Sequence, residues 1–267
     1  GITNNSTFTA GSGQYSFINN PQNLTGAFSI PHVFVNGVTV TNNGSVTVGT
    51  NFDVTGTWLQ AAGTTLNLGG ILSINSLNAT AANNTVQYSG GSQAVFPTTY
   101  SNLTIAQTAG EASLGGNAFV NGTLTLSARN LNLSGFNLTL GTASPAVAGG
   151  PFTSTKMIIA TGGSQLRKEF SAGGTFTFPI GDNFGTNDFS PIDVTVAGTV
   201  FAPSAYIGEG TGTCFRRTST SIVDRDTEVD LANLESIKNH LSFKNPEERA
   251  LVLQKIAELL NESQEEK

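Results

Sequence analysis

The sequence predicts a mainly β protein: a parallel β-helix (solenoid), a following β-strand segment and a small C-terminal α-helical hairpin. Two observations predict the solenoid. Short apolar alternations recur every 7 or 8 residues, and Asn-Gly pairs at 36–37, 43–44 and 121–122 supply tight turns between them. A third observation separates the helical end: only 11% of the 267 residues are charged, and most of those lie in the last 57.

Each alternation places Val, Leu or Phe on one face of a strand and Thr, Asn or Ser on the other. Three strands at this step make a coil of 21–24 residues, a plausible β-helix coil, and Asn and Thr suit ladders at its corners. An antiparallel sandwich fits the same spacing, and we favour the β-helix. The alternating pairs are Val38/Val40, Val46/Val48, Phe52/Val54, Leu66/Leu68, Leu72/Ile74, Leu124/Leu126, Leu131/Leu133 and Leu138/Leu140.

The change in charge density predicts a domain boundary within residues 208–221. After it, Leu234, Ile237 and Leu241 recur at helical spacing, and Asn245-Pro246 marks the start of a second helix. We expect an antiparallel helical hairpin that docks or self-associates; a fusion of unrelated sequence is the alternative. The predicted domains are a solenoid at 1–160, a β-rich segment at 161–210 that closes the solenoid or forms a small β domain, a linker at 211–228 and the two-helix segment at 229–267.

Composition excludes two classes of partner. Phosphate binding needs clustered Lys and Arg, and the net charge is −6, so we expect no nucleic acid. No apolar run approaches the roughly 20 residues that span a bilayer, so no membrane span is expected.

Catalysis is not predicted on the repeat. Over residues 1–165 the only carboxylates are Asp53 and Glu111, and the candidate bases Arg129, Lys156 and His32 fall on different repeats. Glycoside hydrolysis needs two carboxylates about 5–10 Å apart, so a polysaccharide-degrading enzyme stays only as an alternative.

The segment 182–193 is the candidate metal site, because Asp182, Asn183, Asp188 and Asp193 carry oxygens that Ca²⁺ accepts. Its spacing is not that of an EF-hand, and Asx-turns explain the same residues. We favour a connection between two strands, with Phe176 and Phe178 inward on one and Ile192, Val194 and Val196 inward on the other. No other cofactor is expected.

Trp58, Tyr88 and Tyr100 are candidate stacking platforms for a sugar if they are exposed. Packing inside the coils is the alternative and the commoner fate of aromatic residues in strands.

Residues 30–210 resemble repeat regions of large secreted surface proteins of Bacteroidota. The resemblance rests on "YSNLTI" at residues 100–105 and on a pattern that reads Gly163, Leu166, Arg167, Phe170, then Phe176, Phe178, Pro179, Gly181, Asp182, then Phe189, Ser190, Pro191 and Val194. It implies export by the type IX secretion pathway and adhesin-like display at the cell surface, and it assigns no catalytic residue.

Together these observations predict a non-catalytic extracellular surface or adhesive structural module with a neutral Thr/Asn-rich β surface. Surface glycans or other surface proteins are the expected partners. A carbohydrate-binding module and a polysaccharide-degrading β-helix enzyme are the alternatives.

Overall fold

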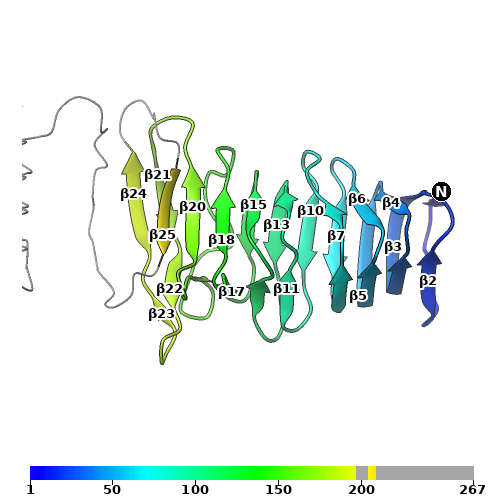
Figure 1. The fold of residues 1–267 in the computed structure, drawn as a ribbon, viewed down its shortest axis with the longest axis horizontal. Helices are drawn as coiled ribbons and strands as arrows, with labels where there is room; N and C mark the ends of the chain where they lie inside the picture. Colours follow the sequence, from blue (N-terminus) through cyan, green and yellow to red (C-terminus); the bar gives the residue numbers. More distant parts are fainter. Residues whose placement is uncertain (197–203, 209–267) are drawn as a thin grey trace, which may run out of the picture. The chain divides into compact units, whose positions relative to one another are not determined.

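The protein is a parallel β-solenoid of about nine coils with three faces (Figure 1). The structure, a computed structural model, describes residues 1–196 and 204–208. It contains strands and no helix in that part, and accordingly no helix there is long and apolar enough to cross a membrane. The predicted linker at 211–228, the two-helix segment at 229–267 and its self-association lie outside the described residues.

Face 1 carries one short strand from each coil. Its strands are β1 (Ile2–Asn4), the start of β3 (Gln22–Val35), β4 (Thr39–Asn42), β6 (Thr57–Gln60), β9 (Leu77–Asn78), β12 (Thr99–Tyr100), β15 (Ala118–Val120), β18 (Asn137–Leu140), β20 (Gln165–Glu169) and β25 (Ser204–Gly208).

Face 2 is a continuous succession of parallel pairings. It contains the middle of β3, the start of β5 (Ser45–Val54), β7 (Thr65–Leu68), β10 (Thr85–Tyr88), β13 (Asn102–Ile105) and β16 (Leu124–Leu126).

Face 3 completes each coil. It contains β2 (Gln14–Phe17), the ends of β3 and β5, β8 (Ile71–Ile74), β11 (Gln93–Val95), β14 (Ala112–Leu114), β17 (Leu131–Asn132), β19 (Ile158–Ile159), β22 (Ile180–Asp182) and β23 (Asp188–Phe189).

Most coils are shorter than the 21–24 residues that the strand spacing predicts. Thr65 pairs with Thr85, and Thr85 pairs with Asn102. The strand ladders join residues 17 to 22 apart, except 27 and 28 apart across the longer loop between β18 and β19. The coils are short because some corners contain no separate turn. Strand β3, for example, continues through all three faces within 14 residues.

Alternation within most strands builds the core, as predicted. Leu66, Val86, Leu103 and Leu124 stand at one ladder position on face 2, and all four side chains are fully buried. Burying a side chain of this size stabilises a fold by about 1.5–3 kcal/mol. Because the ladder repeats at every coil, these contributions accumulate along one continuous core.

Buried amides form part of the corner between faces 1 and 2, where the sequence predicts Asn and Thr ladders. Asn42 Nδ2 donates to Gln60 Oε1 at 2.8 Å, and the Thr64 hydroxyl donates to the same oxygen at 2.8 Å. Asn42 Nδ2 also donates to the Thr65 carbonyl on the next coil, at 2.8 Å. The amides therefore link neighbouring coils where the strands turn.

Gly44 stands at the same corner because the backbone of the preceding coil passes directly against it. A Cβ on Gly44 would lie 2.0 Å from the carbonyl oxygen of Gly26. Any side chain there would force two hydrogen-bonded coils apart.

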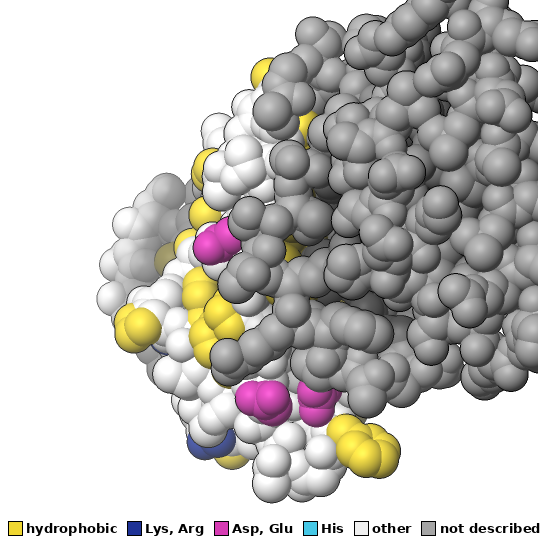
Figure 2. Space-filling model, turned by 90° about the vertical axis from the view of Figure 1, so that its left-hand side faces the viewer, with side chains coloured by type: hydrophobic (Ala, Val, Ile, Leu, Met, Phe, Trp, Pro, Cys, Tyr) yellow, Lys and Arg dark blue, Asp and Glu magenta, His cyan; other side chains and the backbone are white. Residues whose placement is uncertain are grey.

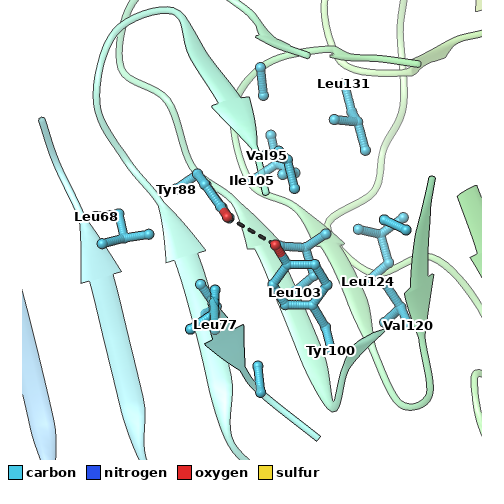
Figure 3. Close-up of a cluster of buried hydrophobic side chains, with 14 of the residues drawn as sticks. Leu68, Leu77, Tyr88, Val95, Tyr100, Leu103, Ile105, Val120, Leu124 and Leu131 are labelled. Atoms are coloured by element: carbon cyan, nitrogen blue, oxygen red, sulfur yellow. Dashed lines mark hydrogen bonds between the residues drawn. The ribbon is translucent and has the colours of Figure 1, made fainter. Parts of the chain in front are cut away.

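The hydroxyls of Tyr88 and Tyr100 are hydrogen-bonded to each other inside the core (Figure 3). Both also bond to the backbone of Phe96, which closes a cycle of three hydrogen bonds. The Tyr100 hydroxyl donates to the Phe96 carbonyl, so Tyr88 is the donor in the 2.9 Å contact between the two hydroxyls. The Phe96 N–H in turn donates to Tyr88 Oη at 3.0 Å. Both backbone groups of this corner residue are thereby satisfied next to the apolar interior.

The last coil is retraced in the reverse direction. β20, β21 (Gly174–Phe178) and β22 run forward; after Asp182 the chain returns as β23, β24 (Ile192–Val196) and β25, each antiparallel to its forward partner. The expected hairpin with Phe176, Phe178 and Val194 buried is confirmed. Figure 2 views this end of the stack, where hydrophobic side chains and carboxylates lie among uncharged polar groups.

We expect Gly44→Ala to lower the free energy of unfolding by about 3 kcal/mol, because its Cβ meets backbone that cannot move aside. Urea denaturation measures the loss. Gly174→Ala is the matched control: no atom lies within 4 Å of its Cβ position, so its effect should stay within about 0.5 kcal/mol. Equal effects of the two changes would contradict the close approach.

The tyrosine pair predicts a loss of stability in alkali. Burial raises the pKa of Tyr88 to about 12 and holds the pKa of Tyr100 well above its usual value. Up to about pH 11 both hydroxyls stay protonated in the folded chain, whereas in the unfolded chain they ionise near pH 10. Stability is therefore full below pH 10 and falls above it, by about 1.4 kcal/mol per tyrosine at pH 11.

Urea denaturation from pH 8 to pH 11, compared with Tyr88→Phe/Tyr100→Phe, checks this prediction. The double variant is less stable at pH 8, by roughly 1–3 kcal/mol, because the Phe96 groups lose their partners. Its additional loss between pH 8 and 11 should be smaller than that of the wild type. Parallel pH profiles would show that the hydroxyls ionise freely in the folded state.

Candidate functional site

The three aromatic residues proposed as stacking platforms are all fully buried, so the structure corrects that expectation. Trp58, Tyr88 and Tyr100 have no exposed surface. The Trp58 ring packs edge-on against Phe52, with ring centroids 4.9 Å apart. Tyr88 and Tyr100 are hydrogen-bonded to the Phe96 backbone. None of the three aromatic residues therefore offers a ring face to a sugar.

The aspartate-rich segment is the hairpin that reverses the chain. Asp182 and Asp188 are paired across β22 and β23, and Asp182 Oδ1 accepts the Phe184 N–H at 3.0 Å in an Asx-turn. A Cβ on Gly181 would lie 2.1 Å from the Asp188 carbonyl oxygen, so this glycine permits the tight pairing.

The four Ca²⁺ candidates do not form one oxygen cluster. Asp193 belongs to a different sheet, where it accepts a hydrogen bond from the Thr177 hydroxyl of β21. Asp182 and Asp188 are engaged at the hairpin, and the Asn183 side chain is exposed beside them. Within residues 1–196 and 204–208, no group of three or more His, Cys, Asp and Glu side chains is placed to hold a metal ion.

The remaining titratable groups are spread over separate coils. Glu111 Oε1 accepts a hydrogen bond from Asn132 Nδ2 at 3.0 Å, and the exposed Arg129 donates to the Thr108 carbonyl at 3.3 Å. Asp53 lies on the outward side of β5, on face 3. Lys156 Nζ donates to the Gly149 carbonyl. In the described part of the chain, no hydrogen bond joins any two of these titratable groups to each other.

Lys168 is the one buried cation of the described chain. It occupies an inward ladder position beside Leu140, and its Nζ donates to the Gly141 carbonyl at 2.6 Å. Nζ also lies 5.6 Å from the Phe170 ring centroid and 5.7 Å from that of Phe176. Burial lowers the pKa of Lys168, and the neighbouring Glu169 partly opposes that effect. Its place inside the last coil indicates a role in packing that end.

An uncharged row of hydroxyls and amides covers face 2. We call it the face-2 array; its side chains point outward from five consecutive coils and are half-buried or exposed. Its members are Ser45, Thr47, Thr65, Asn67, Thr85, Gln87, Asn102, Thr104 and Thr125.

The array keeps hydrogen-bonding capacity for contacts outside the chain. Gln87 Nε2 donates to Asn67 Oδ1 at 3.3 Å, which ties two neighbouring coils together. Among the described residues, no hydrogen bond engages the hydroxyls of Thr65, Thr85 or Thr104. The row therefore presents polar groups at the regular inter-strand spacing of about 4.8 Å.

A groove of about 470 Å³ lies on the outer side of face 1, across β12, β15, β18 and β20. We call it the Phe119 groove. Thr99, Phe119, Thr139 and Arg167 stand at one ladder position on four successive coils, and Asn117 and Asn137 border them. Among the described residues that line it, Arg167 is the only charged one.

Sequence reasoning missed this groove. Phe119 and Arg167 are 48 residues apart and were not singled out as ligand residues. The only signal in the sequence is that Phe119 falls on the outward, Thr/Asn side of its "NAFV" strand, where an aromatic residue is out of pattern.

Comparison with protein-family models, with curated proteins and with solved structures finds no match to the chain. The resemblance to Bacteroidota surface proteins therefore stays a prediction, and function has to be argued from the surfaces described above.

Proposed function

We propose that the solenoid is a non-catalytic surface module that makes adhesive contacts through its neutral, Thr/Asn-rich β surface outside the cell. The observation that carries this proposal is the face-2 array: nine outward polar side chains on five coils without a formal charge. Such a row can exchange hydrogen bonds with a hydroxyl-rich surface, and it requires no desolvation of charge.

The distribution of titratable groups also supports a module without chemistry of its own. General acid–base catalysis requires donors and acceptors within hydrogen-bond reach of one reacting bond. Here Asp53 and Glu111 lie on separate coils, and the aspartates of the reversal hairpin are engaged in turn formation. The extracellular setting and type IX export are part of the proposal, and their support is the sequence pattern of residues 30–210.

The array predicts that added charge weakens adhesion. Beads coated with the full chain should adhere to a neutral polysaccharide gel. Thr65→Glu/Thr104→Glu should reduce adhesion about fivefold or more, because a contact would then bury unpaired carboxylates. Shear-detachment counts measure the effect.

Asn51→Glu/Ser113→Glu is the matched control, because both residues are outward positions on face 3 and add the same charge. It should leave adhesion near that of the wild type. Equal losses in both variants would contradict a specific role of face 2. Release of reducing ends or unsaturated products from a polysaccharide panel would instead identify an enzyme.

A further inference from the structure

We propose that the Phe119 groove binds a saccharide that carries a carboxylate, such as a uronic acid unit of a glycan. The site lies on face 1, apart from the face-2 array, and it goes beyond the proposed adhesive function because it selects one class of ligand.

The groove combines an apolar plane with polar surroundings. Phe119 is half-buried, and its outward neighbours on the adjoining coils are Thr99 and Thr139. The groove is open and lined mostly by polar side chains around this one aromatic ring, and its volume of 470 Å³ is large enough for a small ligand. The C–H face of a pyranose ring matches such a surface, because its hydroxyls stay at the rim.

Gly141 sets the position of the aromatic ring. A Cβ on this glycine would lie 3.0 Å from Phe119 Cε1 and 3.2 Å from Cζ. The Phe119 ring therefore rests against Gly141 at the end of β18. It can lie there because Gly141 has no side chain. This contact holds the ring in place before a ligand arrives, which reduces the entropy lost on binding.

Arg167 gives the groove its preference for an acid. Its Nε donates to Gln165 Oε1 at 2.9 Å, which orients the guanidinium along β20. Glu169 lies two residues further along the same outward side. No hydrogen bond or ion pair within the described chain engages the Nη atoms of Arg167. A guanidinium with free Nη donors binds a carboxylate through two parallel hydrogen bonds.

Two asparagines supply donors for sugar hydroxyls. Asn117 Oδ1 accepts the backbone N–H of Asn137 at 2.8 Å, which fixes the amide and leaves its Nδ2 as a donor at the groove. The Asn137 side chain and the Thr99 and Thr139 hydroxyls border the same space. These groups both donate and accept, as a polyhydroxylated ligand requires.

The charge of the groove separates a sugar acid from other acidic ligands. One guanidinium matches one carboxylate, whereas phosphate polymers require clustered cations. An acidic peptide would use Arg167 and the two amides equally well, but an acidic side chain offers no C–H ring face to the Phe119 ring. The combination of ring, amides and one cation therefore favours the saccharide.

Calorimetric titration of the full chain with trigalacturonic acid and with its methyl ester tests the inference. The ester keeps the shape of the trisaccharide and removes its charge. We expect saturable binding of the acid and about tenfold weaker binding of the ester, the difference that a charge-assisted hydrogen-bond pair supplies. Arg167→Gln should weaken binding of the acid about tenfold and leave the ester unchanged.

Phe119→Leu should weaken binding of acid and ester alike, because it removes the ring and keeps an apolar side chain. Arg129→Gln is the charge-matched control: it removes one exposed arginine remote from the groove and should change neither affinity. Thermal melting of each variant verifies that it is folded.

Three outcomes would overturn the inference: no saturable binding of the trisaccharide acid, equal affinity for acid and ester, or equal losses in Arg167→Gln and Arg129→Gln. Tighter binding of triglutamate than of trigalacturonate would identify a peptide site instead. Adhesion of the Arg167→Gln beads to neutral gel should be unchanged, so failure here is distinguishable from failure of the face-2 proposal.

Discussion

The hydrogen-bond ladder between successive coils is the constraint on which the structure depends. Each coil lies about 4.8 Å from the next, and its backbone groups are satisfied by its two neighbours. Side chains at one ladder position are therefore stacked in rows, inward or outward, along the whole solenoid. An inward row such as Leu66, Val86, Leu103 and Leu124 becomes core, and an outward row becomes surface. On such a scaffold, a binding surface is formed by outward rows of side chains more than by loops.

A ladder also creates an end at which backbone groups have no next coil. The chain meets this at β22 by turning back at Asp182 and laying β23, β24 and β25 antiparallel to the last forward strands. An open parallel edge is a template for association with other strands, and a reversed final coil alters the hydrogen-bond pattern that such strands would meet. The aspartates of this segment thus have a structural explanation in the reversal itself.

The sequence was sufficient to predict which side of each strand faces the core, but not which residues of successive coils are paired. Period-two alternation predicts the inward rows, and the same rule places Tyr88 inward beside Val86, so its burial was readable from "TVQY". The coil length was overestimated because strands such as β3 continue through corners without a turn. The Phe119 groove depends on which residues share a ladder position, and that depends on coil lengths that vary from 17 to 28 residues. No local sequence pattern gives the length of each coil. The shared ladder row of Phe119 and Arg167 could therefore not be predicted from the sequence.

The groove and the reversed end of the solenoid meet at Gly141. The Gly141 carbonyl accepts a hydrogen bond from Lys168 Nζ inside the last coil. The Phe119 ring packs against the Gly141 Cα on the outside. The inward Lys168 and the outward Arg167 are adjacent on β20, so one strand supplies both the amine that fixes Gly141 and the guanidinium of the groove. A rearrangement of the last coil would therefore move ring and cation together. The proposed ligand site lies where an inward contact from Lys168 and an outward contact with Phe119 meet at the same residue, Gly141.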